Sequence, residues 1–110
     1  MEGKGTFYWN DGTRYVGEYK NDKKEGKGRY FYNDGERYEG DWNNDIKEGK
    51  GIYYYKDGER CEGDWKNDIK EGKGIYYYND GKLMGHYSND KPIGKHALLK
   101  NNGKIKIINF

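Results

Sequence analysis

The sequence has few of the residues that usually build a core or carry chemistry. Of its 110 residues, 32 % are hydrophobic and 36 % are charged, a balance often found in disordered chains. The single cysteine, Cys61, excludes an internal disulfide and favours a reducing compartment. No apolar run approaches the ~20 residues of a membrane-spanning helix, and no signal peptide is recognisable. We therefore expect a cytoplasmic protein, with association with the cytoskeleton or a membrane surface left open.

An excess of charge of one sign is also missing. The 21 basic and 19 acidic residues are intermixed along the chain, whereas a nucleic-acid-binding protein gathers its basic residues on one face. We expect no nucleic-acid partner. Aromatic residues are abundant instead: 13 Tyr, 3 Trp and 3 Phe. Because disordered segments are usually poor in aromatic residues, the composition predicts a folded chain whose core consists mainly of tyrosine rings.

All 18 glycines fall into four columns with a period of 23 residues, shortened to 22 at the end of the chain. Scattered, flexible glycines would not repeat in this way. Each column is therefore expected to serve a fixed backbone purpose, either a positive φ or the close approach of another group. The columns are Gly3, Gly26, Gly49, Gly72 and Gly94; Gly5, Gly28, Gly51 and Gly74; Gly12, Gly35, Gly58, Gly81 and Gly103; and Gly17, Gly40, Gly63 and Gly85.

Each unit begins with Gly-Lys-Gly or a close variant and places an aromatic run before an Asp-Gly pair. A second short segment and a polar loop such as KNDIKE follow. This order predicts a β-hairpin, and no helical period is present. We predict an all-β fold, an elongated single-sheet antiparallel meander of stacked β-hairpins that bury their aromatic faces on one another. The predicted repeats are 3–25, 26–48, 49–71 and 72–93, within residues 1–94, and residues 94–110 are a degenerate repeat or a capping hairpin.

A three-residue hairpin loop, Asn10 to Gly12, determines which side chains share a face. It places large rings and glycines on one face, so that a ring of one strand lies over a glycine of the next, and this face is predicted to be the core. The other face carries charged residues and an additional aromatic column. In this register Tyr8 lies opposite Arg14, and the same pairing recurs as Phe31 with Arg37 and Tyr54 with Arg60.

The fourth repeat is one residue shorter, at YYYNDGKLMGHY. We predict a two-residue turn at Asp80 and Gly81, which pairs Asn79 with Lys82 and Tyr78 with Leu83. This turn preserves the side-chain alternation. It also places Met84 and His86 on the outer face, where the earlier repeats carry Glu and Asp. The C-terminal end of the rod is therefore expected to differ in what it contacts.

The pattern G-x-G-x-Tyr-x-Tyr-x-Asp-Gly-x-x-Tyr-x-Gly-x-Trp resembles the MORN (membrane occupation and recognition nexus) repeat family over residues 3 to about 94. The resemblance implies a β-rod that acts as a binding or scaffolding module. Members of this family act in membrane–cytoskeleton scaffolds, in junctions between membranes, and as accessory segments of lipid kinases or methyltransferases. Phospholipid binding has been proposed for the family, and protein-mediated assembly is its better-supported role. The family commonly has a small or polar residue at positions 8, 31, 54 and 77, which are aromatic here.

Nothing in the sequence favours catalysis. The chain has one serine, Ser88, and two histidines, His86 and His96, and Cys61 occupies a core column otherwise held by tyrosine. Acidic residues recur in every repeat, whereas a catalytic pair needs a unique environment. The Gly-Lys-Gly segments lack the phosphate-loop pattern, and the acidic loops lack calcium-loop spacing. We predict no enzyme, no cofactor and no metal.

The outer aromatic column is the strongest candidate for a protein-binding surface, because exposed apolar area marks interaction sites and Tyr and Arg are typical of interface hot spots. The alternative is that these rings only stack on the neighbouring arginines. The final segment, GKIKIINF, either caps the rod or pairs with another chain, which leaves open a homodimer through terminal edge strands. The predicted partner-binding residues are Tyr8, Phe31, Tyr54, Tyr77, Arg14, Arg37, Arg60, Ile105 and Ile107.

Two further functions stay open. Lysines in or beside the loops between hairpins would attract an anionic membrane, although acidic residues in the same loops oppose that field. The chain would otherwise be an accessory module of a larger enzyme. The candidate lipid-binding lysines are Lys24, Lys27, Lys47, Lys50, Lys70 and Lys73.

Overall fold

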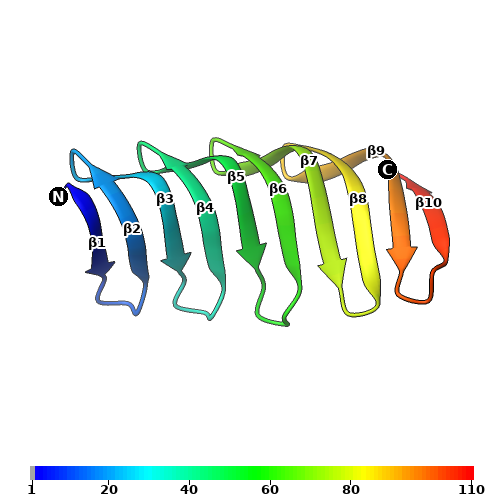
Figure 1. Cartoon of the computed structure of the whole chain (residues 1–110), viewed down its shortest axis with the longest axis horizontal. Coiled ribbons are helices and arrows are strands. Elements are labelled where there is room, and N and C mark those ends of the chain that lie inside the picture. Colours follow the sequence, from blue (N-terminus) through cyan, green and yellow to red (C-terminus); the bar gives the residue numbers. More distant parts are fainter. Residues whose placement is uncertain (1) are drawn as a thin grey trace.

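The computed structural model describes residues 2–110, which form one open sheet of ten antiparallel strands in sequence order. The strands lie side by side along a rod of 48 × 24 × 19 Å (Figure 1). The predicted all-β meander of stacked hairpins is thus confirmed. The strands are β1 (Gly3–Tyr8), β2 (Arg14–Lys20), β3 (Lys23–Phe31), β4 (Arg37–Asn43), β5 (Ile46–Tyr54), β6 (Arg60–Lys66), β7 (Ile69–Tyr78), β8 (Gly81–Ser88), β9 (Lys91–Lys100) and β10 (Ile105–Asn109).

The loop inside each of the first three hairpins has the predicted three residues. The Trp9 amide donates to the Thr13 carbonyl at 2.9 Å, and Gly12 closes the loop with a φ of 92°. Tyr8 pairs with Arg14 as predicted. Figure 1 shows these loops along one long edge of the rod and the connections between hairpins along the other.

The connections between hairpins are shorter than the predicted polar loops. Each connection is a two-residue Asn-Asp turn, as at Asn21 and Asp22, and both residues have positive φ. Asn and Asp tolerate this conformation, and two positive φ values define the type I′ turn that suits a tight hairpin. The lysines that follow therefore belong to strands, and the register then shifts between Gly17 and Tyr19.

The turn of the fourth repeat has the predicted length but lies at a different place. It is formed by Asn79 and Asp80, so Tyr78 pairs with Gly81 and Tyr76 with Leu83. The predicted turn at Asp80 and Gly81 is wrong because β9 lies close to Gly81, where a Cβ would overlap the Leu99 carbonyl oxygen. The shift is an even number of residues, so Met84 and His86 face outward as predicted.

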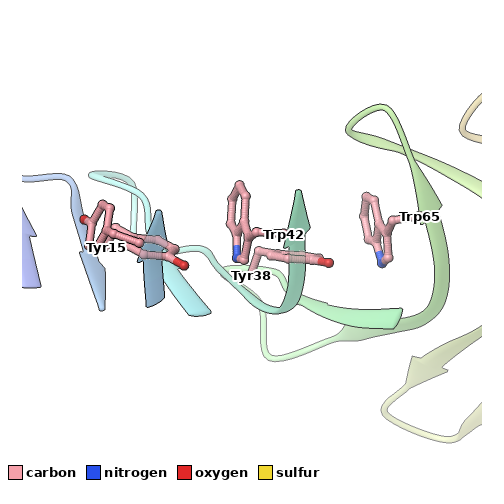
Figure 2. Close-up of a cluster of buried hydrophobic side chains, with 5 residues drawn as sticks. Tyr15, Tyr38, Trp42 and Trp65 are labelled. Atoms are coloured by element: carbon pink, nitrogen blue, oxygen red, sulfur yellow. The ribbon is translucent and has the colours of Figure 1, made fainter. Parts of the chain in front are cut away.

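Tyrosine and tryptophan rings alternate along the core face. Tyr38 is fully buried and meets Trp42 and Trp65 edge-on, each with ring centroids 5.2 Å apart, an arrangement visible in Figure 2. The hydroxyl end of Tyr38 lies over Gly51, where an added Cβ would overlap it. This contact confirms the prediction that a ring of one strand covers a glycine of the next.

At the C-terminal end a histidine takes the place of the tyrosine over glycine. His96 is buried, and its ring lies over Gly85 between Tyr87 and Phe110. Strand β10 pairs with β9, and the Phe110 amide donates to the Gly94 carbonyl at 2.9 Å. The final strand therefore covers the last ring of the core face.

Candidate binding surface

The outer face, opposite the core, presents three rows that run along the rod, with one position from each strand except that the charged row ends at β9. All nine predicted partner-binding residues lie on this face, eight of them in one row. The charged row is Lys4, Glu18, Lys27, Asp41, Lys50, Asp64, Lys73, His86 and Lys95; the middle row is Thr6, Val16, Arg29, Glu39, Ile52, Glu62, Ile75, Met84, Ala97 and Ile107; the aromatic–arginine row is Tyr8, Arg14, Phe31, Arg37, Tyr54, Arg60, Tyr77, Lys82, Leu99 and Ile105.

Each arginine of the aromatic–arginine row stacks on a ring of the following hairpin. The Arg37 Cζ atom lies 3.7 Å from the centroid of the Tyr54 ring, and Arg14 and Arg60 stack in the same way on the next hairpin's ring, at 3.9 Å. Within its hairpin Arg14 lies opposite Tyr8, as the register predicts. Its guanidinium group, however, stacks on Phe31 of β3, the strand on its other side. Such contacts are worth about 0.5–1 kcal/mol at exposed sites. They hold the side chains of the row in fixed positions.

Three of the six candidate lipid-binding lysines lie on the core face instead of in loops. The Lys47 Nζ atom lies 5.3–5.7 Å from four ring centroids, those of Tyr32, Tyr38, Tyr53 and Trp65. Burial lowers the pKa of the Lys47 ammonium group. Lys24 occupies an equivalent cage of four rings. The face on which each lysine lies depends on the length of the turn before it. Sequence reasoning predicted longer polar loops instead of two-residue turns, so it missed these cages.

Lys70, the equivalent lysine of the next repeat, also lies on the core face but contacts fewer rings. The Lys70 Nζ atom lies 5.2 Å from the centroid of the Tyr87 ring and 3.5 Å from the Tyr55 hydroxyl. Cys61 stands here in the tyrosine column, and burial raises the pKa of its thiol. The thiol is thus a core residue, as the sequence predicts.

Two more candidate lysines form ion pairs in the charged row. Lys27 pairs with Asp41, and Lys50 pairs with Asp64. The hydrogen bond from Lys50 lowers the pKa of the Asp64 carboxyl. The sixth candidate, Lys73, is exposed and pairs in the sheet with His86.

Acidic residues in the connecting turns and in the strands that follow them tie successive repeats together. The Lys24 amide donates to Asp45 Oδ1 at 2.8 Å, and the Asn44 amide donates to Glu25 Oε2 at 2.7 Å. Equivalent bonds recur one repeat later, at Asp68 and Glu48. These carboxylates accept backbone bonds, so their role is explained by the stacking of the hairpins.

A groove of about 990 Å³ follows the outer face over the C-terminal half of the rod. Ile75, Met84 and Ile107 line one side, and Lys73 and His86 line the other. Its floor is the glycine backbone of β5 to β8. Sequence reasoning placed Met84 and His86 on this face, but it did not reveal the groove.

Over residues 2–110, no group of three or more His, Cys, Asp or Glu side chains is placed to hold a metal ion. A search of the described chain for a helix long and apolar enough to cross a membrane finds none.

A family model described as the MORN repeat matches residues 1–14, 15–37, 38–60 and 61–82. The second, third and fourth units start at Tyr15, Tyr38 and Cys61, which are successive members of one core column. Among curated proteins, none shows significant similarity to this chain.

Proposed function

The chain belongs to the MORN repeat family, and from this premise we propose that it is a non-catalytic scaffold that binds a protein partner through the aromatic–arginine row. The observation that carries the proposal is the regular alternation of four rings and three guanidinium groups over strands β1 to β7. Tyr, Trp and Arg are the residues that dominate protein interfaces energetically. Tyr8, at one end of the row, is 72 % exposed.

The stacked arrangement supports binding because it reduces the entropy that a partner must overcome. Ordering a free, rotamer-rich side chain at an interface costs about 0.5–1.5 kcal/mol. Arg37 and Arg60 are already held on rings of the next hairpin. A partner lying along the rod therefore meets several prepared contacts at once.

The test replaces three rings of the row together, Phe31→Thr, Tyr54→Thr and Tyr77→Thr. The wild-type chain and this variant are immobilised and exposed to the same cell extract, and retained proteins are identified by mass spectrometry. We expect proteins that the wild type retains to be lost from the variant, while circular dichroism and Tm stay close to wild type. A control variant carries Thr at the exposed loop positions Asn33, Lys56 and Asn79.

Two outcomes would contradict this proposal. If the triple variant unfolds, the rings are structural. If it retains the same proteins as the wild type, the partner binds elsewhere. The resemblance to the family also allows this chain to be a module of a larger enzyme. In that case the aromatic–arginine row would bind another segment of the same polypeptide, and replacing its rings should weaken that contact.

Binding to anionic lipid through the loop lysines is a separate proposal. Lys24 and Lys47 are enclosed by rings, and Lys27 is ion-paired, so few of the six ammonium groups are free to meet a membrane. Sedimentation with phosphatidylserine vesicles tests it. Binding that disappears in high salt and on reversal of Lys27, Lys50 and Lys73 to Glu would favour the lipid.

Self-association through edge strands has one observation in its favour. Ile105 and Ile107 of β10 are 68 % and 55 % exposed, and the outer edge of β10 pairs with no strand of residues 2–110. Exposed apolar edge strands readily pair with other chains. A concentration-dependent molecular mass that Ile107→Lys abolishes would support this contact.

A further inference from the structure

We propose that the groove on the C-terminal half of the outer face binds a polypeptide segment that carries apolar side chains in one row and carboxylates in the row beside it. This inference rests on the proposed function only in that the occupant is a protein. It concerns the middle and charged rows, which are separate from the aromatic–arginine row. The observations that carry it are a wall whose lysines, Lys73 and Lys95, form no ion pair within residues 2–110, and an apolar wall that faces it across the groove; Glu62 is the acidic residue of the lining.

The positive wall results from the loss of the acidic partner in the charged row. In the second and third hairpins Lys27 pairs with Asp41, and Lys50 pairs with Asp64. In the fourth hairpin the same position opposite Lys73 is His86. Within the described chain neither Lys73, His86 nor Lys95 forms an ion pair, and all three side chains are exposed.

The apolar wall begins in the same hairpin. Met84 stands in the middle row where β4 and β6 carry Glu39 and Glu62. Ile75, Ala97 and Ile107 continue the row on the neighbouring strands. A purely solvated face would have no need for this change. An apolar strip beside unpaired cations matches a segment with the complementary pattern.

The distribution of the cations favours a polypeptide over an amphiphile such as a lipid. Lys73 on β7 and Lys95 on β9 lie about 10 Å apart, two strand spacings, with His86 of β8 between them, so the positive groups are spread along the groove. A single lipid has one charged headgroup and needs its cations at one end. A polypeptide can place several carboxylates along its length while its apolar side chains cover Ile75 and Met84.

The experiment uses the complete chain and a phage-displayed library of random peptides. Selected peptides are synthesised with a fluorophore, and their Kd is measured by fluorescence anisotropy. We expect the selected sequences to combine Asp or Glu with Leu, Ile, Met or Phe. The decisive variant is Met84→Glu with His86→Asp, which gives the fourth hairpin the outer residues of the second and third. Its Kd should rise about tenfold or more, because the new carboxylate pairs with Lys73 and the apolar wall is interrupted.

The matched control is Lys20→Gln with Lys66→Gln, which lowers the net charge by a similar amount at exposed strand ends away from the groove. It should bind the peptides as the wild type does, and all variants should keep the wild-type Tm. An unchanged Kd in the groove variant overturns the inference, and so do selected peptides without carboxylates.

Two further outcomes separate this inference from its rivals. Phosphatidylserine vesicles that bind the wild type and not the groove variant, with no peptides selected, would assign the groove to lipid and overturn it. Peptides that lose affinity in the Phe31, Tyr54 and Tyr77 variant but not in the groove variant would support the proposed function and overturn the groove site.

Discussion

At the residue scale, the glycines that pair across adjacent strands determine how closely the aromatic rings approach the sheet. Glycines of adjacent strands pair with one another, as Gly17 does with Gly28 and Gly40 with Gly51. The buried Tyr15 and Tyr38 rings occupy the space that side chains would take at Gly28 and Gly51. Protein interiors are close-packed, so an added methyl group at such a site must displace a ring.

Gly51→Ala tests this close approach. The new Cβ would overlap the end of the Tyr38 ring, which cannot move away because Trp42 and Trp65 hold it on both sides. We expect the free energy of unfolding to fall by about 1–3 kcal/mol, as for other overpacked cores. Urea denaturation measures the change. In a Tyr38→Leu background the extra cost of Gly51→Ala should shrink, and equal costs in both backgrounds would argue against the contact.

The caged lysines make a second prediction at this scale. Lys47 buries its alkyl stem among four rings while its ammonium group interacts with their faces. Lys47→Ala should therefore lower the free energy of unfolding by about 2 kcal/mol. Lys66→Ala, at an exposed position of β6, should change it by no more than about 0.5 kcal/mol. Equal Tm values for the two variants would show that the cage contributes nothing.

At the scale of the strands and turns, the two-residue alternation and the glycine columns were enough to predict both faces of the sheet. The pairing of Tyr8 with Arg14 and the core position of Cys61 follow from them. Turn positions were less predictable. Gly81 stands in the column of turn glycines, but it lies in strand β8, where the backbone of β9 approaches it closely. The face of the sheet on which the Lys47 side chain lies also depends on the length of the preceding turn, which composition does not determine. The binding role of the outer row stays a prediction.

The last hairpin makes a prediction at this scale. Neither ring nitrogen of the buried His96 has a hydrogen-bond partner in the described chain, and a buried unsatisfied polar group costs about 1–3 kcal/mol. His96→Phe keeps a ring over Gly85 and between Tyr87 and Phe110. We expect it to raise the free energy of unfolding by about 1 kcal/mol and to raise Tm. His86→Gln, on the exposed outer face, is the control and should leave Tm unchanged.

At the scale of the whole molecule, the core is a continuous stack of tyrosines. Each hairpin contacts only its neighbours, so stability is the sum of similar interfaces. Burial raises the pKa of the phenol groups along this stack, to about 12 for Tyr32 and further for Tyr15, Tyr38 and Tyr53. The protein therefore carries many groups that resist ionisation only while it is folded.

Alkaline pH should therefore unfold the rod cooperatively. Below about pH 10 the phenols are protonated in both states, so they add no pH dependence. Above about pH 10 the unfolded chain loses these protons and the folded chain retains them, so the free energy of unfolding falls as pH rises. Each phenol contributes about 1.4 kcal/mol per pH unit. The lowered pKa of Lys47 acts in the opposite direction, but it is one group against several. Far-ultraviolet circular dichroism and tyrosinate absorbance should change together, and a core that ionises while the sheet signal persists would contradict this account.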